Sequence, residues 1–149
     1  MPNEAAHPIF EYSQVDDRIF IGTNACCQMH FSAMLSEKGI TSDISLEAEQ
    51  IDQPFGVETY LWLPTLDHQP PSLRNTFIGI TSLESMLESG HKVYIHCKNG
   101  HGRAPTFYAA YLVVQRGMKP SEAIALLAAK RPSMHLETSQ RTFLDSLTK

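Results

Sequence analysis

The sequence is poor in cysteine and has no long apolar run, and each shortage argues against a class of protein. Three cysteines, an odd number, do not make a disulfide framework, so we expect free thiols in a reducing compartment. The longest apolar runs, residues 107–114 and 123–129, are far too short to span a bilayer. The first residues lack the basic start and apolar stretch of a secretory signal. These absences predict a cytoplasmic protein.

Basic charge is also scarce, because 12 Lys and Arg residues stand against 16 Asp and Glu residues, for a net charge of −4. Nucleic acids and anionic membranes both bind preferentially to broad basic surfaces, so neither is expected as the main partner. The sequence shows no internal repeat, linker or low-complexity tract. Its 149 residues, 42% of them hydrophobic, predict one domain over residues 1–149 with a substantial core.

The first half of the chain is expected to contain mainly strands. Apolar, β-branched and aromatic residues, with the turn residues between them, indicate these elements. The predicted elements are a hairpin of residues 12–15 and 18–22 around Asp16-Asp17, a helix over 31–38 ended by Gly39, a strand over 41–46, and a stronger strand over 57–63 that Pro64 stops.

The second half predicts four helices and one strand. Ser72 can cap a long helix that ends at Gly90, with an apolar face of Leu73, Phe77, Ile80, Leu83 and Leu87. A short strand over 92–96 and a glycine loop precede a buried helix over 103–116, ended by Gly117. Two more helices are predicted: one has Pro120 in its first turn, and the other has an inner face of Leu136, Gln140, Phe143, Leu144 and Leu147. Strands alternating with helices predict an α/β domain with a central, mostly parallel sheet flanked by helices.

The glycine loop carries the chemistry, in the segment His96-Cys97-Lys98-Asn99-Gly100-His101-Gly102-Arg103. A loop between a strand and a helix N-terminus surrounds an anion with backbone N–H groups, and the helix dipole adds positive potential. The same field stabilises a thiolate at Cys97, which then needs no histidine as base. Arg103 has a planar fork that can hold two phosphate oxygens and stabilise the charge that develops on them. The segment therefore predicts capture of a phosphoryl group.

The pattern His96, Cys97, Gly100 and Arg103 resembles the signature loop of the protein tyrosine phosphatase superfamily. Chain length and element order resemble its small dual-specificity branch, over roughly residues 12–147. The resemblance implies a phosphocysteine mechanism without metal or cofactor. It also implies that Lys98, Asn99, Gly100, His101 and Gly102 form the phosphate-binding loop and that His96 supports it. A lone Cys-x5-Arg spacing also occurs in sulfurtransferase-like and arsenate-reducing folds.

The resemblance further implies a general acid, an aspartate about thirty residues before the cysteine. Asp67 lies in the loop over residues 64–71 and fits that place, whereas Asp52 and Glu49 are too far upstream. Asp67 would protonate the leaving oxygen and then activate the water that hydrolyses phosphocysteine. Because Cys97 must react as an anion while Asp67 holds a proton, we expect a bell-shaped pH dependence with an optimum at about pH 5–6.5.

Ala104 departs from the family, which usually has Ser or Thr after the arginine to help expel the cysteine thiolate. A Gly-Arg-Ala-Pro sequence resembles some glucan phosphatases, so the departure does not by itself indicate inactivity. It predicts slow breakdown of the phosphoenzyme and visible burst kinetics. It also keeps open a second hypothesis, a phosphate-recognition module that binds and barely turns over.

Substrate and redox alternatives remain open at this point. The leading substrate is a phosphorylated protein, with phosphotyrosine first and phosphoserine or phosphothreonine next; a phosphorylated carbohydrate or another small phosphomonoester is the alternative. Lys98 is the one lysine of the loop, which differs from the doubly basic pattern of inositol-lipid phosphatases. Cys26 and Cys27 are interpreted as small buried hydrophobes, with a disulfide to Cys97 as the alternative. The seven histidines show no metal-ligand spacing.

Overall fold

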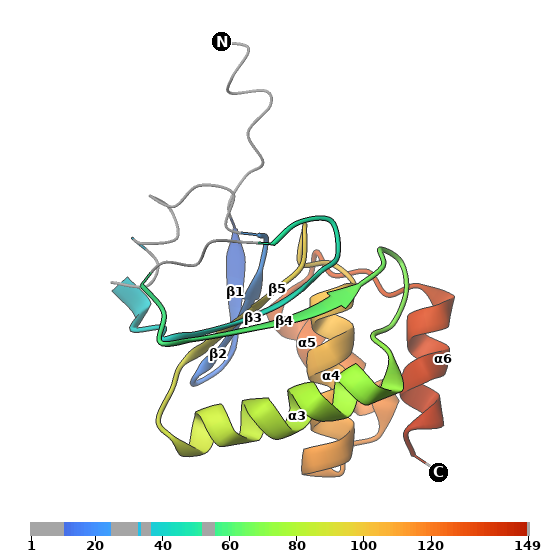
Figure 1. Cartoon of the computed structure of the whole chain (residues 1–149). Helices are drawn as coiled ribbons and strands as arrows, with labels where there is room; N and C mark the ends of the chain where they lie inside the picture. The colour runs from blue at the N-terminus through green and yellow to red at the C-terminus, as the bar shows by residue number, and fades with distance from the viewer. Residues whose placement is uncertain (1–10, 25–32, 34–36, 52–55, 149) are drawn as a thin grey trace.

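A computed structural model describes residues 11–24, 33, 37–51 and 56–148 of the chain. A five-stranded sheet runs through its centre, in the order β1-β2-β5-β3-β4 (Figure 1). The strands are β1 (Tyr12–Asp16), β2 (Ile19–Gly22), β3 (Ser42–Glu47), β4 (Thr59–Thr65) and β5 (Val93–His96). The helices with described bounds are α3 (Leu73–Glu88), α4 (Arg103–Arg116), α5 (Pro120–Lys130) and α6 (Thr138–Ser146).

The sheet is mostly parallel, as the sequence predicts. β2 pairs with β5, β5 with β3, and β3 with β4, all in parallel, while β1 and β2 form the expected antiparallel hairpin. Parallel pairing brings the carboxyl ends of β5, β3 and β4 to one edge of the sheet, where the loops that follow these strands meet.

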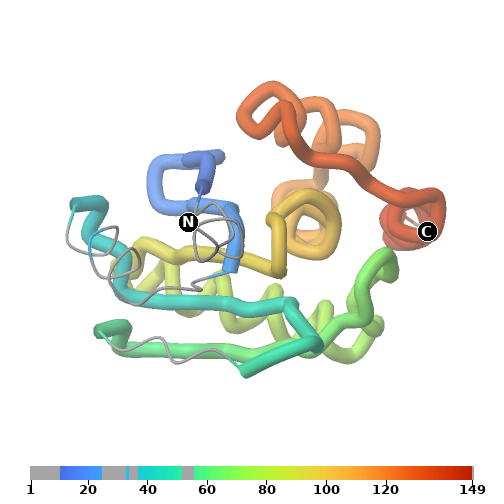
Figure 2. The backbone as a smooth tube through the Cα atoms, turned by 90° about the horizontal axis from the view of Figure 1, so that it is seen from above, coloured from blue at the N-terminus to red at the C-terminus, as the bar shows by residue number. Residues whose placement is uncertain are grey.

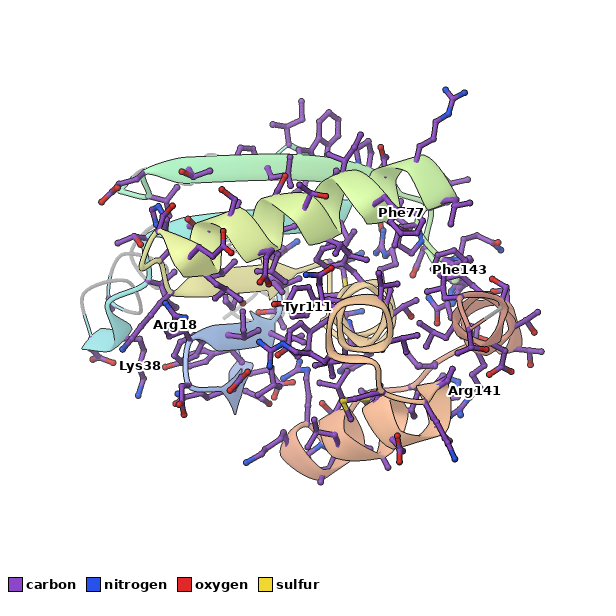
Figure 3. The ribbon with its side chains drawn as sticks, turned by 90° about the horizontal axis from the view of Figure 1, so that it is seen from below. Arg18, Lys38, Phe77, Tyr111, Arg141 and Phe143 are labelled. Carbon is purple, nitrogen blue, oxygen red and sulfur yellow. The ribbon has the colours of Figure 1, made fainter. Side chains whose placement is uncertain are left out.

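Helices α3 to α6 pack on one face of the sheet, and Figure 2 looks onto the sheet from above, with its strands side by side. Strand residues of one parity, such as Ile44 and Ile95, join the main core with these helices, whereas Phe20 and Tyr94 form a second cluster with Ile40 on the opposite face. α4 is buried along most of its length and contacts α3, α5 and α6. Tyr111 of α4, labelled in Figure 3, is fully buried, and its hydroxyl donates to Glu84 on α3. The prediction of a central buried helix is confirmed.

The inner face of α3 differs from the prediction. Ile80, Leu83 and Leu87 are buried, but Leu73 and Phe77 are 55% and 45% exposed. Gly79 explains the difference, because a Cβ at this position would lie 2.8 Å from Leu63 Cδ1 and would also collide with the Phe107 ring. The glycine lets the helix approach the core closely, and this contact turns Leu73 and Phe77 outward.

The prediction that Pro64 stops its strand is wrong, because β4 continues through Pro64 to Thr65. β4 is an edge strand, and its register with β3 shifts between the pairs Ser45–Trp62 and Glu47–Thr65. An edge strand with an irregularity tolerates a residue that has no N–H group. The extension matters for the site, since the carbonyl of Thr65 reaches Arg103.

The other boundaries agree with the sequence to within a few residues. Gly117 caps α4 with a φ of 70°, and Pro120 opens α5. Most of the helix predicted over residues 31–38, together with Cys26 and Cys27, lies outside the described residues. In the part of the chain that is described, no helix combines the length and apolar character that a membrane span requires.

Candidate active site

Residues 97–102 connect β5 to α4 and are termed the phosphate loop here. β5 ends at His96 and α4 begins at Arg103, where the sequence predicts both boundaries. Gly100 has a φ of 72°, and a Cβ there would lie 2.8 Å from Arg131 Nη2. Only glycine combines this backbone conformation with so close an approach, so the path of the loop depends on Gly100.

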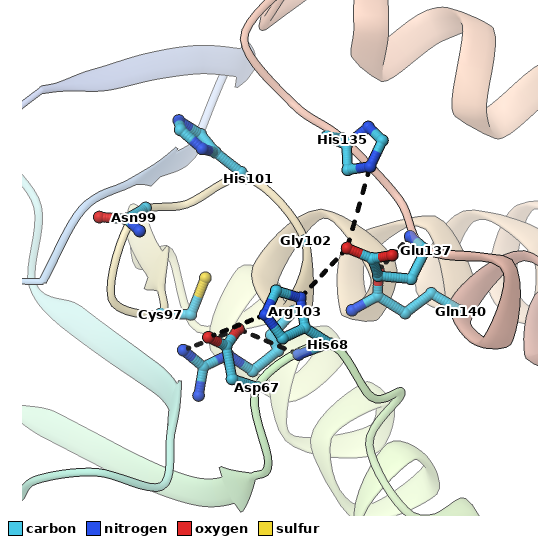
Figure 4. A pocket seen from close by; sticks show the side chains of 10 residues that line it. All are labelled: Asp67, His68, Cys97, Asn99, His101, Gly102, Arg103, His135, Glu137 and Gln140. Carbon is cyan, nitrogen blue, oxygen red and sulfur yellow. Dashed lines mark hydrogen bonds and ion pairs between the residues drawn. The ribbon is translucent and has the colours of Figure 1, made fainter.

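Cys97 is buried at the base of a pocket of about 170 Å³ (Figure 4). The backbone N–H of Gly100 donates a hydrogen bond to Cys97 Sγ at 3.3 Å. The N-terminus of α4 begins six residues after the cysteine and adds unpaired N–H groups with the positive end of the helix dipole. These surroundings favour an incoming phosphate, because they present hydrogen-bond donors and positive potential to an anion.

His96 is fully buried below the phosphate loop. Its Nε2 lies 2.8 Å from Oδ1 of Asp43, which is equally buried on the neighbouring strand β3. Its ring stacks on Tyr94, with the ring centres 5.3 Å apart. These contacts fix the imidazole directly before Cys97, in the place that a supporting role requires; the Asp43 contact has no signal in the sequence.

Arg103 is held by acceptors from the loop after β3 and from the last residue of β4. Its Nη1 donates to Glu49 Oε1 at 2.6 Å and to the Thr65 carbonyl at 2.9 Å, while Nη2 donates to Glu49 Oε2 at 3.0 Å. Burial lowers the pKa of the guanidinium, but the hydrogen bonds to Glu49 and the charge of Cys97 outweigh it, so the net pKa is raised. The guanidinium is therefore charged and oriented before any phosphate arrives.

Glu49 is a residue of the site that sequence reasoning missed. The sequence offers it only as a distant rival for the general acid, yet its carboxylate forms the bidentate pair with Arg103. The hydrogen bond from Arg103 holds the pKa of Glu49 below its usual range. A signal did exist, because Glu49 follows β3, and β3 is the parallel neighbour of the strand that precedes the phosphate loop.

Asp67 lies in the loop between β4 and α3, whose residues 66–71 are termed the acid loop here. The structure brings Asp67 to the same pocket as Cys97, with its Oδ1 3.6 Å from Arg103 Nη2. Its side chain is 56% exposed, so it can exchange protons with water. This is the placement that the sequence predicts for the acid.

Arg131 supports the phosphate loop from behind, although the sequence suggested no role for it. The side chain is 2% exposed. Its Nε donates to the Gly100 carbonyl at 2.8 Å and its Nη2 to the Asn99 carbonyl at 3.1 Å. Nη1 donates to Ser13 Oγ at 3.0 Å. With its carbonyls bound on this side, the loop can turn its N–H groups toward the pocket.

The remaining residues of the phosphate loop divide into two groups. Asn99, His101 and Gly102 line the pocket, together with His135, Glu137 and Gln140 from the start of α6. Lys98 is exposed and is not among the lining residues.

Ala104 is fully buried in the main core, and the next hydroxyl along α4, that of Thr106, donates to the Gly102 carbonyl. Cys97 is a free thiol within the described part of the chain. In residues 11–24, 33, 37–51 and 56–148, no group of three or more His, Cys, Asp or Glu side chains could hold a metal ion.

Comparison with known families identifies this arrangement. Residues 19–148 match the family described as Dual specificity phosphatase, catalytic domain. The chain belongs to this family. The domain therefore covers nearly the whole sequence, including the phosphate loop, the acid loop and Arg131.

Two curated relatives show how far the similarity extends. Laforin of Mus musculus is 24% identical over 159 residues, covering 91% of this chain and 48% of laforin. The Rattus norvegicus protein named phosphatidylglycerophosphatase and protein-tyrosine phosphatase 1 is 36% identical over 95 residues, covering 63% of this chain and 49% of that protein. The chain thus spans about half the length of these curated relatives.

Solved structures of dual specificity phosphatases superpose on most of the chain. A crystal structure of PTPMT1 in complex with PI(5)P has a TM-score of 0.82 at 25% identity and covers 92% of this chain and 94% of its own. A single-substitution variant of human DUSP28 also has a TM-score of 0.82, at 20% identity, with 95% of each chain covered, which shows the fold alone.

Proposed function

We propose that the protein hydrolyses phosphate monoesters through a phosphocysteine on Cys97. The observation that carries this proposal is the convergence of three groups on one pocket: the buried thiol of Cys97, the pre-oriented guanidinium of Arg103 and the carboxyl of Asp67. A nucleophile, a charge stabiliser and an acid are the parts that phosphoryl transfer needs.

In the first step the Cys97 thiolate attacks phosphorus, and the bond from phosphorus to the ester oxygen breaks. Asp67 gives its proton to the departing oxygen, so the leaving group departs as an alcohol or phenol. Arg103 and the N–H groups of the phosphate loop stabilise the charge on the equatorial oxygens. The products are free alcohol and phosphocysteine.

In the second step the carboxylate of Asp67 takes a proton from water, and the water oxygen attacks phosphorus. The bond between phosphorus and sulfur breaks, returning the Cys97 thiolate and releasing phosphate. Ala104 offers no hydroxyl to the departing sulfur, and the Thr106 hydroxyl already donates to the Gly102 carbonyl. We infer that this second step is the slower one.

The rim of the pocket supports a protein substrate bearing phosphotyrosine, with phosphoserine and phosphothreonine accepted too. The side chains of Asp67, His68 and His135 at the rim are 56%, 70% and 75% exposed, which leaves the pocket open to solvent. An open rim lets shorter phosphorylated side chains bring their phosphorus to Cys97. A lipid-linked or other metabolite phosphate is the second candidate, because relatives are named for phosphatidylglycerophosphate hydrolysis and one structural neighbour was solved with PI(5)P.

One experiment tests the reaction class. p-Nitrophenol release from its phosphate is measured with EDTA present for the wild type, Cys97→Ser and Asp67→Asn. We expect that EDTA leaves the wild-type rate of p-nitrophenol release unchanged and that Cys97→Ser abolishes it. Absence of wild-type turnover with retained vanadate binding would instead support a phosphate-recognition module.

A substrate panel then separates the two candidates. Phosphotyrosine, phosphoserine and phosphothreonine peptides are compared with phosphatidylglycerophosphate, inositol-lipid phosphates and phosphorylated sugars, using phosphate release as the readout. A kcat/KM for phosphotyrosine peptides above that for every lipid and sugar supports the protein substrate. The reverse order would replace it with a metabolite.

A further inference from the structure

His68 has a backbone conformation that histidine rarely adopts. Its φ is 66°, and among the described residues it is the one non-glycine residue with positive φ. Such a conformation persists only where the surroundings hold it. His68 directly follows Asp67, so whatever holds His68 also determines where the carboxyl of Asp67 lies.

The contacts that hold His68 come from the start of α6, about seventy residues later in the chain. His68 Nδ1 lies 3.1 Å from Glu137 Oε2, and Ser139 Oγ donates to the His68 carbonyl at 2.9 Å. Gln140 Nε2 donates to the Gln69 carbonyl at 3.2 Å. Three contacts thus attach the acid loop to one helix end.

On its other side His68 contacts the acid itself. The His68 N–H donates to Asp67 Oδ1 at 3.0 Å, and His68 Nε2 lies 3.5 Å from Asp67 Oδ2. Asp67 Oδ1 in turn lies 3.6 Å from Arg103. Figure 4 shows this continuous line of contacts from Glu137 through His68 and Asp67 to Arg103.

The start of α6 is also fixed to the phosphate loop. The His135 N–H donates to the His101 carbonyl at 2.7 Å. Gln140 is 1% exposed, and a Cβ on Gly102 would lie 3.2 Å from its Nε2. Leu136 and Leu144 anchor the segment in the core. The helix end that holds the acid loop therefore has a set position relative to Cys97.

We infer that Glu137, acting through His68, and Ser139 are positioning residues that hold Asp67 in reach of the leaving-group oxygen. This inference rests on the role proposed above for Asp67. One segment, residues 135–140, contacts both loops. It therefore fixes the position of the acid relative to the nucleophile. A general acid displaced by about 1 Å loses much of its effect.

Two variants break the attachment without removing a cap from α6. Glu137→Ser keeps a good N-cap, and with Gln140 at the third helical position it retains a capping box, but its short side chain does not reach His68. Ser139→Ala removes the hydroxyl that binds the His68 carbonyl. Lys119→Ser, at the N-cap of α5, and Ser146→Ala, at the far end of α6, are the matched controls.

The readout is kcat/KM for phenyl phosphate and p-nitrophenyl phosphate, because kcat/KM covers the steps up to formation of phosphocysteine. Phenolate is the stronger base and needs the acid; p-nitrophenolate leaves with little help. We expect each variant to lower kcat/KM about tenfold with phenyl phosphate and less than about twofold with p-nitrophenyl phosphate. In an Asp67→Asn background neither variant should have a further effect.

Equal losses with both substrates, or full losses in the Asp67→Asn background, would overturn the inference and leave the phosphatase proposal intact. Hydrogen exchange of the acid-loop amides provides a readout that needs no activity. Exchange of the amides of residues 66–69 should rise about fivefold in both variants and stay unchanged in both controls. Unchanged exchange in Glu137→Ser and Ser139→Ala would overturn the inference even if the wild type proved inactive.

Discussion

The phosphate loop and the acid loop face each other across one pocket, but they are held in opposite ways. The phosphate loop is backed by side chains that are almost completely buried, His96 and Arg131, and continues directly into the central helix α4. The acid loop is held by partly exposed contacts with the start of α6. The comparison indicates a phosphate loop that is rigidly supported and an acid loop, the proposed source of the proton, that is held by weaker contacts.

Removing the support of the phosphate loop should have the largest effect. Arg131→Met leaves the Gly100 and Asn99 carbonyls without their buried donor, so we expect the free energy of unfolding to fall by about 3 kcal/mol. Urea unfolding with and without vanadate measures this, and the stabilisation by vanadate should disappear. Arg141→Met, an exposed arginine on α6, should stay within about 0.5 kcal/mol of the wild type. Wild-type stability with full vanadate stabilisation in Arg131→Met would contradict the interpretation that buried side chains support the phosphate loop rigidly.

Removing the acid should reduce catalysis and leave the fold unchanged. Asp67→Asn is expected to lower kcat/KM for phenyl phosphate about 100-fold, since the amide has no proton to give. Its side chain is 56% exposed, so the free energy of unfolding should change by less than about 0.5 kcal/mol. A stability loss as large as that of Arg131→Met would remove the contrast between the two loops.

Glu49 acts between the two loops. Its carboxylate holds Arg103, the residue that directly follows the phosphate loop and lies 3.6 Å from Asp67 of the acid loop. Glu49→Gln weakens the bidentate pair, and we expect about a tenfold fall in kcat/KM from a less well oriented guanidinium. The difference in the free energy of unfolding between the wild type and Glu49→Gln should also depend on pH. The folded-state pKa of Glu49 is lower than its unfolded value of about 4.5, so its stabilisation is complete above that pH.

As the pH falls through the lowered folded-state pKa, Glu49 becomes protonated and the stabilisation is lost. Urea unfolding at pH 7 and at about pH 3 should therefore show the wild type more stable than Glu49→Gln only at the higher pH. A difference that is the same at both values would show that the carboxylate charge is not what stabilises the pair.

Ala104→Ser should have the smallest effect and tests the second chemical step. A hydroxyl at this position can donate to the departing Cys97 thiolate, and we expect kcat to rise about fivefold while the burst amplitude shrinks. Because Ala104 is fully buried, the hydroxyl should cost about 1 kcal/mol of stability. Rapid-quench kinetics with p-nitrophenyl phosphate measure both steps. No burst in the parent protein and an unchanged kcat in the variant would show that the second step was never slow.

The sequence predicted the phosphate loop because its parts are contiguous. A β-branched strand, a cysteine, two glycines and a helix follow one another within about twenty residues, so local preferences alone indicate the geometry. The family resemblance indicated Asp67 by its distance of about thirty residues from Cys97, and the parallel strands bring the two loops to one edge of the sheet. The prediction for Pro64 was wrong because an irregularity in an edge strand admits the proline. The inner face of α3 was predicted wrongly because Gly79 approaches the core closely. Both features depend on neighbours that the local sequence does not reveal.

Only the tertiary structure decided which side chains support the site. Arg103 and Glu49 are 54 residues apart, Arg131 and Gly100 are 31 apart, and Ser139 and His68 are 71 apart. Such pairs depend on how strands and helices pack, because a few ångströms of displacement decide whether a hydrogen bond forms. By itself the sequence predicted the chemistry that we propose for Cys97, Arg103 and Asp67. The packing determined what orients each of them, because orientation is a property of contacts that no local pattern specifies.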